Sequence, residues 1–292
     1  MPASPSLRRR RLAAELRKLR EQSGLSISDV AAKLDWQGSR ISRIETRQLG
    51  ITAPDLRKVL DVYGVDNGSY RARLAEMARR ANERGWWQSY PRHVIPSEYG
   101  DLISVEAEAA TIRSYQPEVM PGLLQTTGYA QAVIRAGRKA DTAAEIGRRV
   151  EVRLERQEVL TRTDPPPPRV SIVLNEAVLR RRVGGPAVMR EQLEYLMAER
   201  DRGNVTIQVL PFDSGAHPAM VGPFTMMTFL DPADLGVVYL EHPTSSLFLE
   251  EPEDLRAYEE FWDAIQSDAY SPDDSRAFLK TYSLRYSDER LK

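Results

Sequence analysis

The sequence predicts a multidomain protein in which an all-α domain of five helices is followed by an α+β domain with a mostly antiparallel sheet. Its length of 292 residues exceeds what one helical module needs and suits two domains. Apolar residues recur at helical spacing through the first 84 residues, whereas short apolar runs typical of strands begin after residue 168. We place the first domain at 1–84, a linker or junction at 85–100, and the second domain at 101–292.

Five helices are expected in the first domain, and each has a start or stop signal. The first, 8–23, ends at Gly24, and Ser26 with Asp29 forms a capping box that begins the second. The third covers about 39–46, the fourth begins at 52–55 with a proline in its first turn, and the fifth covers about 69–83. Their inward-facing residues include Leu12, Leu16, Val30, Ala31, Leu34, Ile41, Ile44, Leu56, Leu60, Tyr63, Tyr70 and Leu74.

The second domain is predicted to contain both helices and strands. Helical segments are expected near 104–115, 126–137, 142–163, 186–201, 252–267 and 272–283. Strand-like runs lie at 170–174, 205–212, 223–230, 236–241 and 246–250. Short turns join the later runs, which favours antiparallel hairpins. Four consecutive prolines at 165–168 cannot continue a helix and predict a stiff, extended connector.

Charge divides the chain in two. Residues 1–88 contain 18 basic and 10 acidic residues, a net charge of +8, which leaves 23 basic and 32 acidic residues and a net charge of −9 for the remainder. This asymmetry indicates that only the first domain meets a polyanion. A solvated basic face with no partner would explain the charge alone equally well.

Residues 25–45 predict two short helices joined by a tight turn, the unit that fits a DNA major groove. Ala31 is small where the helices must cross, Asp35 tolerates the left-handed turn, and Ile41 and Ile44 anchor the second helix. The groove-facing end carries the candidate base-reading residues Gln37, Ser39, Arg40 and Arg43. An arginine can grip guanine with two hydrogen bonds, which contributes about 1–3 kcal/mol of discrimination.

Phosphate contacts are expected at the helix edges, from Ser26, Ser28, Lys33 and Arg47. Arginines on small helical bundles are commonly only solvated, so these residue types alone do not decide the matter. The joint pattern of five helices, well-placed breaks and a small residue at the crossing favours DNA binding.

The stretch LSISDVAAKLDWQGSRISRIE, residues 25–45, resembles the helix-turn-helix of the Xre and phage-repressor family, and residues 17–65 follow that family's lambda-repressor-like five-helix outline. The resemblance implies base reading by Ser39, Arg40 and Arg43, and a backbone-contacting loop at Thr46 and Arg47. It also implies an internal ion pair between Arg20 and Glu45. The sequence departs from the pattern at Ile27, where many relatives carry a DNA-contacting glutamine, and at Gly38.

Residues 100–285 resemble the second domain of an actinobacterial family of Xre-type regulators described as antitoxin-like. The matching stretches include VEAEAATIRSYQPEVMPGLLQTTGYA at 105–130 and IQVLPFDSGAHPAMVGPFTMMTF at 207–229. The resemblance implies a regulatory or partner-binding domain, often paired with a small neighbouring protein.

Four features of the junction and the second domain have two interpretations each. Residues 121–126 form a structural corner or a ligand-contacting loop, and 212–218 form a plain connection or line a pocket. Trp86 and Trp87 serve packing or stack on a base or effector. The basic cluster 180–182 is a solvated turn, or it meets an acidic partner or flanking DNA.

Catalysis is not expected. The three histidines, His93, His217 and His242, lie far apart without metal-ligand spacing, and there are no cysteines. No phosphate loop or dinucleotide fingerprint occurs. Tyr239, Glu241 and His242 lie near Ser245 and Ser246, but no nucleophile-elbow sequence frames them. We therefore expect no catalytic residues, no metal and no cofactor.

The sequence as a whole predicts a cytoplasmic transcription regulator. Neither a secretory signal nor a run of about 20 apolar residues is found, so no membrane association is expected. The first domain would bind a double-stranded operator as a homodimer, and the second would sense an effector or bind a small partner protein. The alternative is an antitoxin-like protein that mainly sequesters a small cognate protein and autoregulates its operon.

Overall fold

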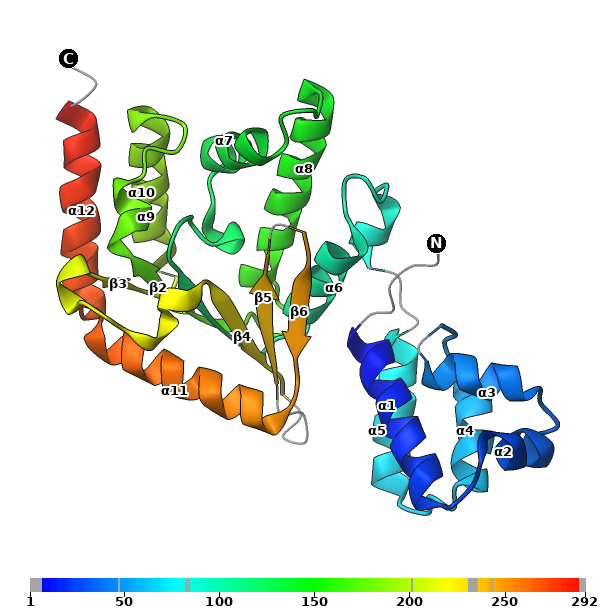
Figure 1. Ribbon diagram of the computed structural model, residues 1–292. Helices are drawn as coiled ribbons and strands as arrows, with labels where there is room; N and C mark the ends of the chain where they lie inside the picture. Colours follow the sequence, from blue (N-terminus) through cyan, green and yellow to red (C-terminus); the bar gives the residue numbers. More distant parts are fainter. Residues whose placement is uncertain are drawn as a thin grey trace. The chain divides into compact units, whose positions relative to one another are not determined.

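The computed structural model describes residues 7–46, 48–81, 85–200, 202–230, 236–242 and 244–288. The chain forms two compact units, Met1–Ser104 and Val105–Lys292 (Figure 1). Residues 85–100, predicted as a linker, fall within the first unit. There Trp86–Ser89 form a 3₁₀ turn, and Ser97 begins helix α6, Ser97–Glu106.

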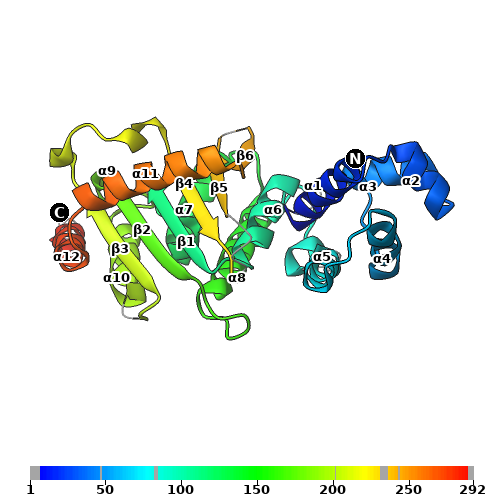
Figure 2. The ribbon, with the colours of Figure 1, turned by 90° about the horizontal axis from the view of Figure 1, so that it is seen from below.

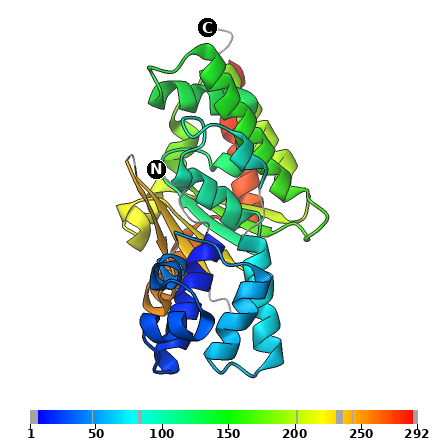
Figure 3. The same ribbon diagram turned by 90° about the vertical axis from the view of Figure 1, so that its right-hand side faces the viewer.

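The five helices predicted for the first domain are confirmed. They are α1 (Leu7–Gln22), α2 (Ile27–Leu34), α3 (Gly38–Glu45), α4 (Ala53–Val62) and α5 (Gly68–Ala81). Figure 3 shows them gathered in one bundle. Their apolar stripes meet in a core made largely of the residues that the spacing predicts, including Leu12, Leu16, Val30, Ile41, Ile44, Leu56, Leu60, Tyr63 and Leu74.

The second unit is built on a mixed sheet of six strands in the order β3-β2-β1-β4-β5-β6. The strands are β1 (Thr111–Gln116), β2 (Arg169–Asn175), β3 (Val205–Leu210), β4 (Phe224–Thr228), β5 (Val237–Glu241) and β6 (Ser246–Leu249). Among the described residues, β1–β4, β4–β5 and β5–β6 pair antiparallel, whereas β1–β2 and β2–β3 pair parallel. The hairpins expected among β4, β5 and β6 are therefore confirmed, but the one expected between β3 and β4 is wrong, since β3 pairs with β2 and two strands separate it from β4.

The helix expected at 104–115 is wrong over its second half. Helix α6 ends at Glu106, and Thr111–Gln116 form β1, in the middle of the sheet. Ile112 and Tyr115 are buried there. Residues of this strand pair on both sides with partners far away in the sequence, as Thr111 does with Arg169 and Thr228. Pairing on both sides overrides the helix-forming preference of the preceding Glu-Ala-rich residues.

Helices cover both faces of the sheet. Helix α11 (Pro252–Asp268) crosses one face, where Leu255, Trp262 and Ile265 join a core cluster with strand residues such as Tyr115 and Phe224 (Figure 2). On the other side lie α7 (Thr127–Gly137), α8 (Ala143–Arg156) and α10 (Pro186–Arg200), the last of which connects the parallel strands β2 and β3 (Figures 1 and 2). The short α9 (Glu176–Arg180) and the C-terminal α12 (Pro272–Asp288) complete the unit.

Candidate nucleic-acid interface

Helix α2 begins with the predicted capping box. The Ser26 Oγ accepts a hydrogen bond from the Asp29 N–H at 3.2 Å, and the Ser26 N–H donates to Asp29 Oδ2 at 2.9 Å. The hydrogen bonds from Ser26 lower the pKa of the Asp29 carboxyl. The Ser26 and Ser28 hydroxyls are 2.8 Å apart and exposed, so the start of α2 presents two hydroxyls to solvent.

The turn between α2 and α3 depends on Asp35. Its φ is 55° and its ψ is 45°, and it is the one residue other than glycine with a positive φ in the described part of the chain. Its N–H and that of Trp36 donate to the last carbonyls of α2, including Ala31 O at 2.9 Å from Trp36 N. The left-handed residue thus ends α2 and redirects the chain into α3, as glycine does in many other helix ends.

Helix α3 is held by two isoleucines. Ile41 and Ile44 are 2% and 5% exposed and lie in the core of the unit, one helical turn apart. The opposite side exposes Ser39 and Arg43, and Gln37 is exposed at the N-cap. The side chains of these three residues make no hydrogen bond or ion pair within the described residues. Because these positions are polar, exposed and fixed by a buried stripe, α3 has the form of a recognition helix.

Arg40 differs from Arg43 in its surroundings. Its Nη2 lies 2.5 Å from Asp55 Oδ2, and its guanidinium stacks 3.8 Å from the centre of the Trp36 ring. Asp55 sits in the first turn of α4, where the Thr52 hydroxyl also donates to it at 3.0 Å. The structure therefore ties α3 to the start of α4 through Arg40, while leaving Arg43 free in solvent.

Asp55 and Trp36 are site residues that sequence reasoning misses. In the sequence, Asp55 marks only a helix start, and Trp36 only a break in the apolar pattern. The separation of fifteen positions between Arg40 and Asp55 carries no spacing signal for an ion pair. Only the packing of α3 beside α4 brings the two side chains together.

The ion pair implied by the resemblance is present. Arg20 donates from Nε and Nη2 to the two Glu45 carboxylate oxygens at 2.7 and 2.9 Å, and from Nη1 to the Leu25 carbonyl at 3.0 Å. The side chains are only 12% and 6% exposed. The hydrogen bonds to Glu45 raise the pKa of Arg20, and burial raises the pKa of the adjacent Tyr63 to about 12. This pair joins the end of α1 to the end of α3.

Both departures from the resembled pattern, Ile27 and Gly38, lie close to where α2 crosses α3. Ala31 is buried at 6% exposure, as expected for a small residue where the helices meet. Ile27 packs partly buried on the core, and a Cβ added at Gly38 would lie 3.8 Å from Ile27 Cγ2. Ile27 thus contributes to the packing of the unit, whereas the distance at Gly38 is an ordinary van der Waals contact that does not itself require a glycine.

Two more of the predicted phosphate contacts, Lys33 and Thr46, lie at the ends of α2 and α3. Lys33 is exposed near the end of α2, and Thr46 is exposed at the end of α3, where its hydroxyl donates to the Ser42 carbonyl at 2.7 Å. Arg47 lies outside the described residues. The structure thus brings candidate base-reading and phosphate-contacting side chains from α2 and α3 into one helix-turn-helix.

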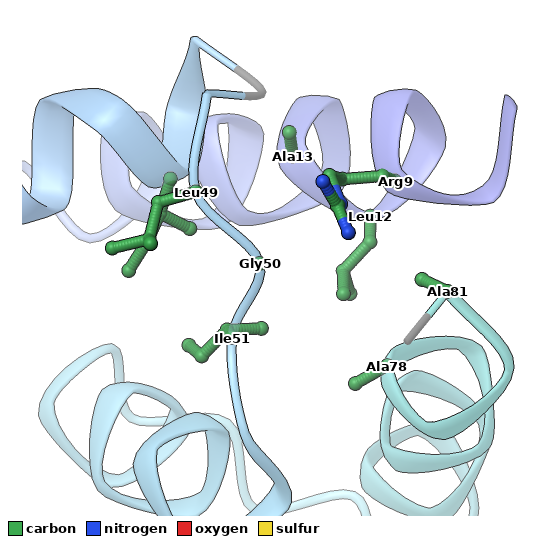
Figure 4. Close-up of a pocket in the computed structure, with 9 residues that line it drawn as sticks. Arg9, Leu12, Ala13, Leu49, Gly50, Ile51, Ala78 and Ala81 are labelled. Atoms are coloured by element: carbon green, nitrogen blue, oxygen red, sulfur yellow. The ribbon is translucent and has the colours of Figure 1, made fainter. Parts of the chain in front are cut away.

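A small hollow in the first unit has a different character. It lies between α1, α5 and residues 49–51, and Figure 4 shows mostly apolar side chains around it. Arg9 is the one charged residue among those that line it. Binding sites for small molecules place several polar groups to orient the ligand, which this hollow does not.

The tryptophans at 86 and 87 serve packing. Their rings meet edge to face at 6.0 Å, and Trp86 makes a similar contact with Tyr90. The Trp87 ring lies so close over Gly85 that an added Cβ would overlap it, and it also lies against Gly100. Only a glycine fits at position 85 beneath the Trp87 ring, which shows that this ring is closely packed.

Residues 121–126 of the second unit form a corner whose polar groups are satisfied internally. The buried Gln192 donates from Nε2 to the Leu124 carbonyl at 2.5 Å and accepts from the Thr126 N–H at 2.7 Å. Gln125 donates to the Met120 carbonyl at 2.6 Å and accepts from Arg153 at 2.7 Å. These bonds favour the interpretation as a structural corner.

The loop after β3 and the basic cluster after β2 are connected to each other. The buried Glu176 carboxylate accepts hydrogen bonds from Arg180, from the Tyr282 hydroxyl at 2.9 Å and from the Phe212 N–H at 3.0 Å. Burial alone would raise the pKa of Glu176, but these hydrogen bonds lower it. Arg181 pairs with Glu118. The loop between β3 and β4 exposes three apolar side chains, Phe212, Met220 and Val221.

The described residues contain no group of three or more His, Cys, Asp or Glu side chains suited to a metal ion. No helix in that part of the chain is long and apolar enough to cross a membrane.

Two family comparisons agree with this division of the chain. Residues 11–81 match a family described as "Helix-turn-helix domain", which covers the five helices and the candidate interface. Residues 99–281 match a family described as "Domain of unknown function (DUF5753)". Neither the comparison with curated proteins nor the comparison with solved structures returned a match. The second match spans more than half of the chain, which therefore belongs to the DUF5753 family and carries a helix-turn-helix domain at its N-terminal end.

Proposed function

We propose that the chain is a sequence-specific transcription regulator of the Xre type, in which α3 reads an operator in double-stranded DNA. The observation that carries this proposal is the two-sided construction of α3. Ile41 and Ile44 fix one face of the helix in the core, Ser39 and Arg43 are exposed on the other face, and Gln37 is exposed at the N-cap. A helix-turn-helix that binds DNA needs these two properties together.

The surroundings of α3 supply the contacts that would set its register on DNA. The exposed hydroxyls of Ser26, Ser28 and Thr46 and the exposed ammonium of Lys33 are suited to phosphate oxygens. The net charge of +8 over residues 1–88 favours approach to a polyanion. Base reading by Arg40 would require its guanidinium to exchange the Asp55 carboxylate for a base edge.

The second domain is proposed to act by binding, without catalysis, as the regulatory part of a cytoplasmic protein. It would sense an effector or bind a small protein. The exposure of Phe212, Met220 and Val221 in one loop favours a protein partner, because large apolar side chains in solvent commonly mark such contacts. This observation also supports the second candidate, an antitoxin-like protein that mainly sequesters a small cognate protein.

Selection of bound duplexes from a random pool tests the proposed function and supplies the operator. On that operator, Arg43→Ala is expected to lower affinity by about 5- to 150-fold, the equivalent of about 1–3 kcal/mol for one bidentate contact. The decrease on random DNA should be smaller. Lys33→Ala is the matched control, because removing a phosphate contact should weaken binding to both duplexes alike. Equal decreases from both changes on both duplexes would contradict base reading by Arg43.

The two candidate functions differ in what accompanies the protein. For the antitoxin-like alternative, a short reading frame should lie beside the gene, and its product should co-purify with the chain in a fixed ratio. Repeating the selection with that product added then separates the candidates. A regulator keeps its operator preference and changes affinity, whereas an antitoxin-like protein shows its main effect on the activity of the small protein.

A further inference from the structure

The hairpin of α7 and α8 in the second unit carries an unusual concentration of free positive charge. The two helices pack through Ile134, Ile146 and Val150, and Figure 1 shows the hairpin in green. The connection between them is held in a defined shape. Thr142 and Glu145 form a capping box at the start of α8, and Arg149 Nε lies 2.7 Å from Asp141 Oδ2.

Residues 135–149 contain five basic and two acidic residues. Both carboxylates have internal roles, since Asp141 pairs with Arg149 and Glu145 completes the capping box. Four cations remain, and all four are exposed and have no hydrogen bond or ion pair from their side chains to any described residue: Arg135, Arg138, Lys139 and Arg148. We call these four residues the basic tip.

The basic tip is distinguished within its unit by having four cations, unpaired among the described residues, within fifteen positions of sequence. Many arginines there are paired with carboxylates, namely Arg149, Arg156, Arg180, Arg181, Arg190 and Arg202. Residues 89–292 as a whole have a net charge of −9, so acidic partners are not scarce. The dipole of α7 stabilises cations at its C-terminus, which accounts for Arg135, Arg138 and Lys139. It does not account for Arg148, which lies in the N-terminal half of α8.

The character of this surface favours a nucleic acid over an acidic protein as the partner. Protein interfaces have an apolar centre, but none of the large exposed apolar side chains in the described part of the chain lies on α7, α8 or their connection. Phosphate contacts need only positive charge and hydrogen-bond donors on a surface that can approach the backbone. Arg138 and Lys139 on the connection, with Arg135 and Arg148 on the two helices beside it, meet that requirement.

We propose that the basic tip is a second phosphate-contacting surface, which binds the DNA backbone outside the base pairs read by α3. This inference rests on the proposed function, because it needs the helix-turn-helix to hold the chain on DNA. The tip adds affinity and no sequence preference.

The test compares two duplexes and two triple variants. The short duplex holds the selected operator in about 20 base pairs, enough for two half-sites, and the long duplex adds about 20 base pairs of random sequence on each side. The tip variant is Arg135→Gln with Arg138→Gln and Lys139→Gln. The control variant is Arg169→Gln with Arg256→Gln and Lys280→Gln, which removes the same charge from other exposed positions of the unit. Circular dichroism and Tm confirm that both variants fold.

Dissociation constants are measured for both duplexes over a range of salt concentrations. The tip variant should bind the long duplex about tenfold more weakly than the unchanged protein and bind the short duplex equally well. On the long duplex, the slope of log K against log salt should become shallower by about 0.9 for each phosphate that the three substituted side chains no longer neutralise, up to about 2.7. The control variant should bind both duplexes like the unchanged protein.

Two outcomes would overturn the proposal. One is a tip variant that binds the long duplex as tightly as the unchanged protein, and the other is an equal weakening with the control variant. Failure of the unchanged protein to bind the short duplex would instead contradict the proposed function itself. Failure of the proposal therefore shows in the variants on the long duplex, whereas failure of the proposed function shows in the unchanged protein on the short duplex.

Discussion

At the scale of single residues, the candidate interface shows how identical side chains take different roles. Arg40 and Arg43 lie three positions apart on α3, and the sequence predicts base reading by both. Arg43 is exposed and unpaired within the described residues, whereas Arg40 is held between the Trp36 ring and the Asp55 carboxylate. The difference comes from neighbours outside α3, and it makes Asp55 the carboxylate that holds the Arg40 guanidinium in place.

Asp55→Asn is expected to raise operator affinity. The amide keeps the hydrogen bond from Thr52 but removes the charge that holds Arg40, so the guanidinium becomes available to a base or phosphate. An increase of about 5-fold, the equivalent of about 1 kcal/mol, corresponds to one modest new contact. Titration of labelled operator and of random duplex measures it.

The control for that change is Asp66→Asn, which removes one exposed carboxylate of the same unit and leaves Arg40 paired. If Arg40 reads a base, Asp55→Asn should favour the operator over random DNA, and Asp66→Asn should not. Matching increases from the two variants on both duplexes would mean that Arg40 makes no base contact and serves only to join α3 to α4.

At the scale of elements, hydrogen-bond satisfaction separates structural corners from binding loops. The 121–126 corner is followed by α7, whose first turn is capped by Thr126. Its backbone groups bond to two glutamines, Gln157 just after α8 and Gln192 on α10. Because its backbone groups are bonded internally, we expect the corner to contribute to the stability of the second unit.

Gln192→Ala is expected to destabilise the second unit by about 2–4 kcal/mol. It leaves the Leu124 carbonyl and the Thr126 N–H buried without this partner, and each such group costs about 1–3 kcal/mol. Urea unfolding followed by circular dichroism measures the change. DNA binding by the first unit should persist, since that unit has its own core.

The control for that change is Glu191→Ala, at the exposed neighbouring position. It should change the free energy of unfolding by less than about 0.5 kcal/mol, as surface substitutions usually do. An unchanged free energy of unfolding for Gln192→Ala would contradict the structural role of the corner.

At the scale of the whole molecule, two compact units carry opposite charge and separate cores. A single α3 has eight residues and would reach few base pairs, so we expect specific binding to need two copies of the chain. In dimeric helix-turn-helix proteins, two recognition helices sit about 34–36 Å apart, in successive major grooves. An operator selected by this protein should accordingly contain two related half-sites.

Sedimentation is expected to show a homodimer at micromolar concentration, both alone and bound to the operator. The stoichiometry on DNA should be two chains per operator. A duplex with one half-site removed should bind far more weakly, because the second reading head then has no matching base pairs to contact. A monomer in both conditions, with one chain per operator, would contradict dimeric reading.

Prediction from the sequence succeeded where the signals are local. The capping box at Ser26, the left-handed turn at Asp35 and the buried pair Ile41 and Ile44 all depend on residues within one or two helical turns of each other. It failed at β1. Thr111–Gln116 follows a helix-forming stretch, and the strand exists because residues 169–174 and Phe224–Thr228 lie on either side of it.

The sequence by itself determined that this protein has a helix-turn-helix followed by a domain with strands and helices, because apolar periodicity and capping residues act over short distances. Only the tertiary structure decided that Arg40 is held by Asp55 and that β1 joins the parallel and antiparallel halves of the sheet. It also decided that four cations on α7, α8 and their connection have no partner among the described residues. Each of these depends on which distant elements pack together, and a packed arrangement is a property of the whole fold that no local spacing records.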